Sequence, residues 1–168
     1  MESSKCVGLL DGNGIYIFLV IGNYNNTLFT NQCIRSIADS IQYNNNEIKE
    51  IIVIDNGEEE YIPQDCLYTP TVIRTNTPLG YGKAYSLGIQ CSNIESEYVL
   101  LLNNDCTVNS NWLDILVQKF SEDPSIKLVG PCIDIDKDYI PGFCSLVKRD
   151  VLEEIGLFNI GFSPGYYE

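Results

Sequence analysis

The stretch Tyr98–Cys106, YVLLLNNDC, constrains the fold more than any other part of the chain. Its first five residues, Tyr98–Leu102, are apolar or aromatic without a break, and the next three are polar. A short uninterrupted apolar run is typical of a strand covered on both faces, although a buried helix segment gives the same pattern. Ligands of open α/β sheets bind just outside the carboxyl ends of the strands. We therefore expect a central strand that delivers Asp105, as a metal-binding carboxylate, to a phosphate-bearing ligand.

Similar patterns recur along the chain and alternate with helical ones. Strands are expected at 15–21, 51–54, 72–73, 98–102, 128–129 and 143–147. Helices are expected at 27–42, 83–91, 111–121 and 149–155. Ser110 is the expected N-cap of the third helix, and Gly156 the residue that ends the fourth. This alternation predicts βαβ units and a mostly parallel sheet in one α/β domain over 15–168, after a flexible segment at 1–14.

The charge of the chain limits its partners. The formal net charge is -13 over 168 residues, with no histidine and no run of basic residues. Nucleic-acid binding needs a basic patch, so we expect no nucleic-acid partner. An acidic chain that binds a diphosphate needs a divalent cation, backbone N–H groups or a few placed basic side chains. Without histidine, serine–histidine and cysteine–histidine catalysis are excluded.

The cysteines and the first apolar run indicate a cytoplasmic protein. Seven cysteines are present, and no two of them form a CxxC pair. Reduced, mostly buried thiols are therefore expected rather than disulfides or a zinc site. The apolar run 15–21 is far shorter than the about 20 residues that a membrane span requires, and no basic region precedes it. We expect neither a secretory signal nor a transmembrane segment.

Polar residues follow four of the expected strands: Asn23–Asn25, Asp55-Asn56, Arg74–Asn76 and Asn103–Asp105. In a parallel sheet these four strand ends lie on one edge and form one cleft. Turns after strands require Asn, Asp and Gly in any case, so a single polar strand end means little. Four together, each with a side chain that can bind a ligand, favour a site.

Five segments, in order, resemble the family 2 glycosyltransferases of the GT-A fold. They are VIGNYNN (20–26), IIVIDNG (51–57), RTNTPLGYGKAYSLGI (74–89), YVLLLNNDC (98–106) and GFCSLVKRDVLEEIGLFN (142–159). The resemblance covers about 15–168 and implies a Rossmann-like, mostly parallel sheet flanked by helices. It also implies a metal-dependent enzyme that transfers a sugar, with inversion, from a UDP- or dTDP-type nucleotide sugar to an acceptor hydroxyl.

The resemblance assigns roles to individual residues. The nucleotide is expected against Tyr24, Asn25, Asp55, Asn56, Arg74, Gly80, Lys83, Asn103 and Asn104. Asp55 at its strand end can accept the imide N–H of a uracil or thymine ring. Asp105, the last residue of a DxD-like motif, is expected to bind Mn²⁺ or Mg²⁺. Such an ion neutralises the charge that grows on the leaving diphosphate.

The chain departs from the family pattern at three places. Asn103 stands where the motif often begins with aspartate, so one carboxylate rather than two faces the metal. The segment between Gly130-Pro131 and Gly142 is shorter than usual. Glu168 aligns with the glutamate of the family's catalytic Glu-Asp pair, and the sequence ends before the aspartate. Glu168 is thus the only candidate base, in a domain that lacks the family's usual C-terminal part.

Two other functions agree with the same sequence. One is a nucleotide-sugar-binding module without transferase activity. The other is an interaction protein that keeps only the fold and assembles with copies of itself through exposed strand edges. The sequence does not specify the sugar, nor whether the acceptor is a glycan, a lipid or a protein.

Overall fold

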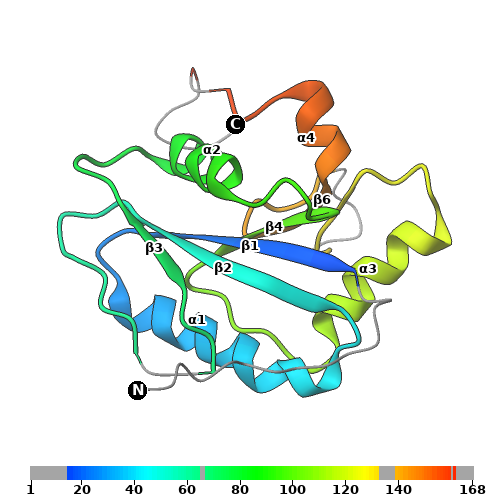
Figure 1. The fold of residues 1–168 in the computed structure, drawn as a ribbon, viewed down its shortest axis with the longest axis horizontal. Helices are drawn as coiled ribbons and strands as arrows, with labels where there is room; N and C mark the ends of the chain where they lie inside the picture. The colour runs from blue at the N-terminus through cyan, green and yellow to red at the C-terminus, as the bar shows by residue number, and fades with distance from the viewer. Residues whose placement is uncertain (1–14, 65–66, 133–138, 160, 162–168) are drawn as a thin grey trace.

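A six-stranded sheet forms the centre of the computed structural model, which describes residues 15–64, 67–132, 139–159 and 161 (Figure 1). The strands are β1 (Tyr16–Asn23), β2 (Glu47–Asp55), β3 (Thr71–Arg74), β4 (Tyr98–Asn103), β5 (Leu128–Val129) and β6 (Cys144–Lys148). Their order across the sheet is β3-β2-β1-β4-β6-β5. The first four are mutually parallel, whereas β6 runs antiparallel to both β4 and β5. The predicted mostly parallel α/β architecture is confirmed.

Helices cover both faces of this sheet. They are α1 (Thr27–Ser40), α2 (Tyr81–Cys91), α3 (Trp112–Glu122) and α4 (Arg149–Ile155), with a 3₁₀ turn at Ile41–Tyr43. Helices α1 and α3 lie on one face, and α2 and α4 lie on the other (Figure 1). Among the helices that the structure describes, none is long and apolar enough to cross a membrane.

Two-sided cover explains the uninterrupted apolar run of β4. Leu100 and Leu102 join the core beneath α1 and α3, whereas Val99 and Leu101 join the core beneath α2 and α4. All four side chains are buried. The expected central strand is therefore confirmed, and the alternative of a buried helix segment is excluded.

Most elements begin or end one or two residues from the predicted bounds, and the largest difference is at the start of β2. Strand β2 begins at Glu47 rather than residue 51, because its pairing with β1 continues back to Tyr16. Helix α2 begins at Tyr81 rather than Lys83. The C-terminal residue of α4 is as predicted, since Gly156 follows it with a φ of 85°, where glycine is favoured.

The predicted Ser110 cap of α3 is wrong. The residue before the helix is Asn111, with a φ of 61° and no side-chain capping bond. Instead, Asn44 Oδ1 accepts the backbone N–H groups of Leu113 at 3.2 Å and Asp114 at 3.3 Å. This cap comes from a turn nearly 70 positions away, so no local pattern around residue 110 could reveal it.

The five cysteines within the described residues are free thiols. Burial raises the pKa of Cys33 and of Cys144 to about 12, and that of Cys106 to about 11. These thiols therefore stay protonated at neutral pH and act as small apolar groups.

Candidate functional site

The C-terminal ends of the four parallel strands lie side by side at one end of the sheet, as the sequence predicted. Asn23 at the end of β1 is level with Asp55 on β2, and Asp55 is level with Arg74 on β3. On the other side of β1, Gly22 is level with Asn103 on β4. Polar residues from four strands are thus brought together.

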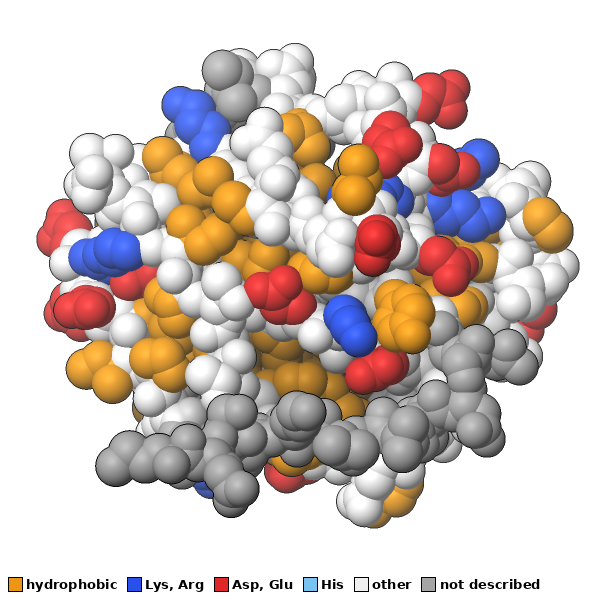
Figure 2. Space-filling view, in the orientation of Figure 1, with side chains coloured by type: hydrophobic (Ala, Val, Ile, Leu, Met, Phe, Trp, Pro, Cys, Tyr) orange, Lys and Arg blue, Asp and Glu red, His pale blue; other side chains and the backbone are white. Residues whose placement is uncertain are grey.

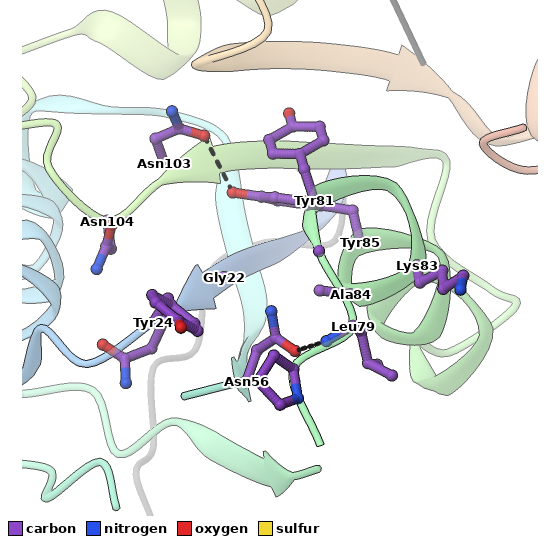
Figure 3. A pocket seen from close by; sticks show the side chains of 13 residues that line it. Gly22, Tyr24, Asn56, Leu79, Tyr81, Lys83, Ala84, Tyr85, Asn103 and Asn104 are labelled. Carbon is purple, nitrogen blue, oxygen red and sulfur yellow. Dashed lines mark hydrogen bonds between the residues drawn. The ribbon is translucent and has the colours of Figure 1, made fainter. Parts of the chain in front are cut away.

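A pocket of about 520 Å³ opens beside this edge, between the strand ends and α2 (Figure 3). Its lining consists of Gly22, Asn23, Tyr24, Asn56, Pro78, Leu79, Gly80, Tyr81, Lys83, Ala84, Tyr85, Asn103 and Asn104. Six residues predicted to bind the nucleotide belong to it: Tyr24, Asn56, Gly80, Lys83, Asn103 and Asn104. Four predicted site residues lie nearby but outside it: Asn25, Asp55, Arg74 and Asp105. Glu168 lies outside the described residues.

The lining of the pocket is nearly uncharged. Among the described residues that line it, none is Asp or Glu, and Lys83 is the one charged side chain. Figure 3 shows the Lys83 side chain extending away from Asn103 and Asn104. On the face drawn in Figure 2, acidic side chains are scattered among a few basic ones rather than gathered in a block. A chain of net charge -13 thus keeps its carboxylates out of this lining.

Helix α2 begins at the wall of the pocket. Gly80 precedes the helix with a φ of 77° and no side-chain cap, and the N–H of Ala84 makes the first backbone bond back to Gly80. The first N–H groups of a helix have no partner within it and carry partial positive charge. Only glycine tolerates this φ readily, so Gly80 lets the helix begin at this point.

Asp55 lies beneath the pocket rather than in its lining. Its carboxylate is fully buried. Oδ1 accepts a hydrogen bond from Asn23 Nδ2 at 3.0 Å, and Oδ2 accepts one from the backbone N–H of Tyr61 at 2.8 Å. Arg74 Nη1 donates to the same Oδ2 at 2.6 Å and also donates to the carbonyl of Glu59. Asp55 and Arg74 therefore connect the C-terminal ends of β1, β2 and β3 with the turn that follows β2.

Asn56, the next residue, faces the pocket instead. Its Oδ1 accepts the backbone N–H of Leu79. Because an N–H can only donate, the amide oxygen must face Leu79, and the NH₂ group points toward the pocket (Figure 3). The sequence predicted both Asp55 and Asn56 as site residues, but it could not show which of the two side chains faces the pocket.

Asn103 and Asn104 lie at the opposite end of the pocket from Asn56 (Figure 3). The hydroxyl of Tyr85 lies 2.9 Å from the carbonyl of Leu102 and 3.2 Å from Asn103 Oδ1. Burial, and to a lesser degree the nearby Tyr81, raise the pKa of Tyr85 well above its usual value, so the hydroxyl remains a donor. Asn104 Nδ2 donates to Thr30 Oγ1 at 3.0 Å.

Asp105 is exposed just beyond this end of the pocket. Within the described part of the chain, no group of three or more Cys, Asp or Glu side chains could hold a metal ion. Mg²⁺ at phosphate sites commonly takes one or two carboxylates, and phosphate and water oxygens complete its coordination. The residues present therefore fit a cation that arrives with a diphosphate, but not a metal ion held by the protein alone.

Sequence reasoning missed two tyrosines and a threonine of this region. Tyr81 and Tyr85, one helical turn apart on α2, form the wall of the pocket with their ring centroids 4.3 Å apart. Their i, i+4 spacing beside the glycine-rich turn was an available signal. The third is Thr30, which lies fully buried in α1 and had no sequence signal.

Comparison with known proteins identifies a family and a fold. The model of the family "Glycosyl transferase family 2" matches residues 18–139. No curated protein sequence matches the chain. Among solved structures, a mannosyltransferase of Pyrobaculum calidifontis in complex with GDP-Man and Mn²⁺ is 16% identical, with a TM-score of 0.64 over 86% of this chain and 47% of its own.

Two structures of S. aureus TarS 1-349 are also similar. The complex with UDP is 14% identical, with a TM-score of 0.63 over 88% of this chain and 51% of its own. The complex with UDP-GlcNAc is also 14% identical, with a TM-score of 0.60 over 83% of this chain and 47% of its own. The chain thus spans about half the length of these structures. At such identities they show the fold alone, which is the expected GT-A fold.

Proposed function

Since the chain belongs to glycosyl transferase family 2, we propose that its pocket binds a nucleotide-sugar donor and that the protein transfers the sugar to an acceptor hydroxyl. One observation carries the proposal. The pocket lies at the carboxyl ends of the parallel strands and its described lining has no carboxylate, although the net charge of the chain is -13. A lining of this kind suits an anionic ligand.

The base of the nucleotide fits the end of the pocket near Tyr24 and Asn56. Tyr24 is 55% exposed and offers a ring on which a base can stack. The NH₂ group of Asn56 can donate to a ring carbonyl, which uracil and thymine both carry. We therefore propose a UDP- or dTDP-type donor, with Asp55 and Arg74 supporting the base site from beneath.

The diphosphate fits between the start of α2 and the Asn103–Asp105 turn. The positive end of the α2 dipole, at the start of the helix, supplies positive potential on one side together with Lys83. On the other side, Asp105 would hold Mn²⁺ or Mg²⁺ together with the phosphate oxygens. When bound, the cation would supply positive charge that stabilises the leaving diphosphate.

The transfer step that we propose is the inverting one that the resemblance to the family implies. The acceptor hydroxyl oxygen bonds to the anomeric carbon as the bond from that carbon to the diphosphate oxygen breaks, which inverts the configuration. A carboxylate takes the proton of the hydroxyl. Glu168 remains the candidate for this base, and it lies outside the described residues. The acceptor is a glycan, lipid or protein hydroxyl.

Titration with UDP in the presence and absence of Mn²⁺ tests the donor site. We expect a single site that binds more tightly with Mn²⁺, measured by isothermal calorimetry. If no heat of binding for UDP or dTDP were seen in either condition, the proposed donor site would be wrong.

Asp105→Ala should abolish the gain in affinity that Mn²⁺ gives and leave metal-free binding nearly unchanged. Asp105 is an exposed carboxylate directly after Asn104, which lines the pocket. Asp123→Ala is a matched control, because Asp123 is an exposed carboxylate outside the pocket lining that accepts hydrogen bonds from Ser125 in its own turn. An undiminished Mn²⁺ effect in Asp105→Ala would contradict the metal assignment.

Tyr24→Ala should weaken UDP binding about tenfold, because stacking of one base on an aromatic ring contributes about 1–3 kcal/mol. The affinity for inorganic pyrophosphate, which has no base, should not change. Tyr43→Ala is the matched control, since Tyr43 is 51% exposed at the far end of α1, outside the pocket lining. Equal losses for UDP and pyrophosphate would show that Tyr24 does not contact the base.

A second candidate is a donor-binding module whose catalytic base comes from elsewhere. The observation that favours it is that the described pocket lining holds no Asp or Glu. Release of UDP from UDP-sugars, measured over a panel of acceptors, separates the two functions. Binding without turnover would favour the module.

A further inference from the structure

Thr30 links the two ends of the site without lining the pocket. It lies in the first turn of α1 and is fully buried. Its Oγ1 lies 2.7 Å from Asn23 Oδ1 and 3.0 Å from Asn104 Nδ2. A buried hydroxyl between two amides determines how each amide is oriented, because each contact must join one donor with one acceptor.

The orientation begins at Asp55. Its carboxylate is ion-paired with Arg74 and can only accept hydrogen bonds. Asn23 must therefore turn its NH₂ group to Asp55, at 3.0 Å, and its carbonyl oxygen to Thr30.

Through Thr30, the orientation of the Asn23 amide determines that of the Asn104 amide. The hydroxyl has one hydrogen, and the contact of 2.7 Å with Asn23 is shorter than its contact of 3.1 Å with the carbonyl of Asn26. With that hydrogen given to Asn23, the hydroxyl can only accept from Asn104. The NH₂ group of Asn104 must then face Thr30, and its carbonyl oxygen must face away from Thr30.

We propose that Thr30 is a positioning residue of the donor site, which makes Asn104 present its carbonyl oxygen rather than its NH₂ group to the ligand. Asn104 lines the pocket, so the carbonyl would meet a ribose hydroxyl or a divalent cation and would disfavour a phosphate oxygen. This inference rests on the proposed function for the identity of the ligand. The contacts that orient Asn104 do not depend on it.

The orientation can be tested without any ligand. In the NMR spectrum, the side-chain NH₂ resonance of Asn104 is identified by its absence in Asn104→Asp. We expect Thr30→Val, which replaces the hydroxyl by a methyl group of similar size, to shift this resonance. Thr30→Ser should leave it in place, as should Thr71→Val, which removes an exposed hydroxyl that bonds to Glu50. An unshifted resonance in Thr30→Val would overturn the proposal.

Binding provides the second test. Thr30→Val should weaken UDP affinity about fivefold, which corresponds to one displaced hydrogen-bonding group, whereas Thr30→Ser and Thr71→Val stay within about twofold of the unmodified chain. In an Asn104→Ala background, Thr30→Val should change the affinity by less than about twofold, because alanine has no amide group to orient. An equal loss in both backgrounds would mean that Thr30 only supports the fold.

The two tests separate the inference from the proposed function. If UDP does not bind the unmodified chain, the donor site is wrong, and the NMR result alone decides the role of Thr30. If UDP binds and Thr30→Val has no effect, the inference is wrong and the donor site stands. Thermal unfolding of each variant shows that it is folded, and Thr30→Ser retains the hydroxyl should Thr30→Val fail to fold.

Discussion

Asp55→Ala is expected to lower the free energy of unfolding by about 3 kcal/mol, because it breaks a buried ion pair that is also hydrogen-bonded. The carboxylate is fully buried, whereas the side chain of Arg74 is 38% exposed, so we place the loss at the lower end of the range for buried pairs. The change also removes the carboxylate that accepts hydrogen bonds from the amide of Asn23 and the N–H of Tyr61. Urea denaturation followed by circular dichroism measures the effect.

The matched control is Glu122→Ala. The pair between Lys119 and Glu122 has the same separation, 2.6 Å, but both of its side chains are nearly half exposed. Its loss should therefore cost no more than about 0.5 kcal/mol. Similar losses for Asp55→Ala and Glu122→Ala would contradict the view that burial makes Asp55 the anchor of the strand ends.

Gly88→Ala is expected to destabilise the protein by about 2 kcal/mol, although alanine is the better helix former by about 1 kcal/mol. A Cβ atom at residue 88 would lie 2.2 Å from Cγ1 of Val20, a fully buried residue of β1. Neither α2 nor the centre of the sheet can move away without disturbing the pocket between them. Urea denaturation shows the loss, and UDP titration should show weaker binding.

Two further variants test the cause of this loss. Gly142→Ala is the control, because its Cβ would meet the side chain of Tyr81 at ordinary distances, 3.5 Å from the hydroxyl and 4.0 Å from Cζ. Val20→Ala in the Gly88→Ala background should recover part of the stability, since the added methyl group then fills the space that valine leaves. Strictly additive losses would show that the contact between residues 20 and 88 is not the reason.

The sequence was most informative where burial alone determines structure. The apolar runs of β1, β2 and β4 are each covered on both faces, so position and type could be read from residue character. The cap of α3 could not be read this way. It depends on Asn44, which reaches the helix only after the chain has folded.

The candidate site was also predicted only in part. The strand ends, and therefore Asn56, Asn103 and Asn104, follow from the parallel sheet and were predicted. Which side chain at each end faces the pocket depends on local backbone direction, and this separates Asn56 from its buried neighbour Asp55. Thr30 acts only through other side chains, so no residue type or spacing marks it in the sequence.

The reversal of chain direction between β4 and β6 has a consequence during synthesis. Every described residue that lines the pocket has been made by residue 104, but the strand that pairs with the outer edge of β4 begins at Cys144. Until then the edge of β4, including the N–H of Asn103 that later bonds to Phe143, has no partner strand. A nascent chain arrested between these points should expose the unpaired edge of a six-residue apolar strand, and chaperone binding or aggregation should peak in that window.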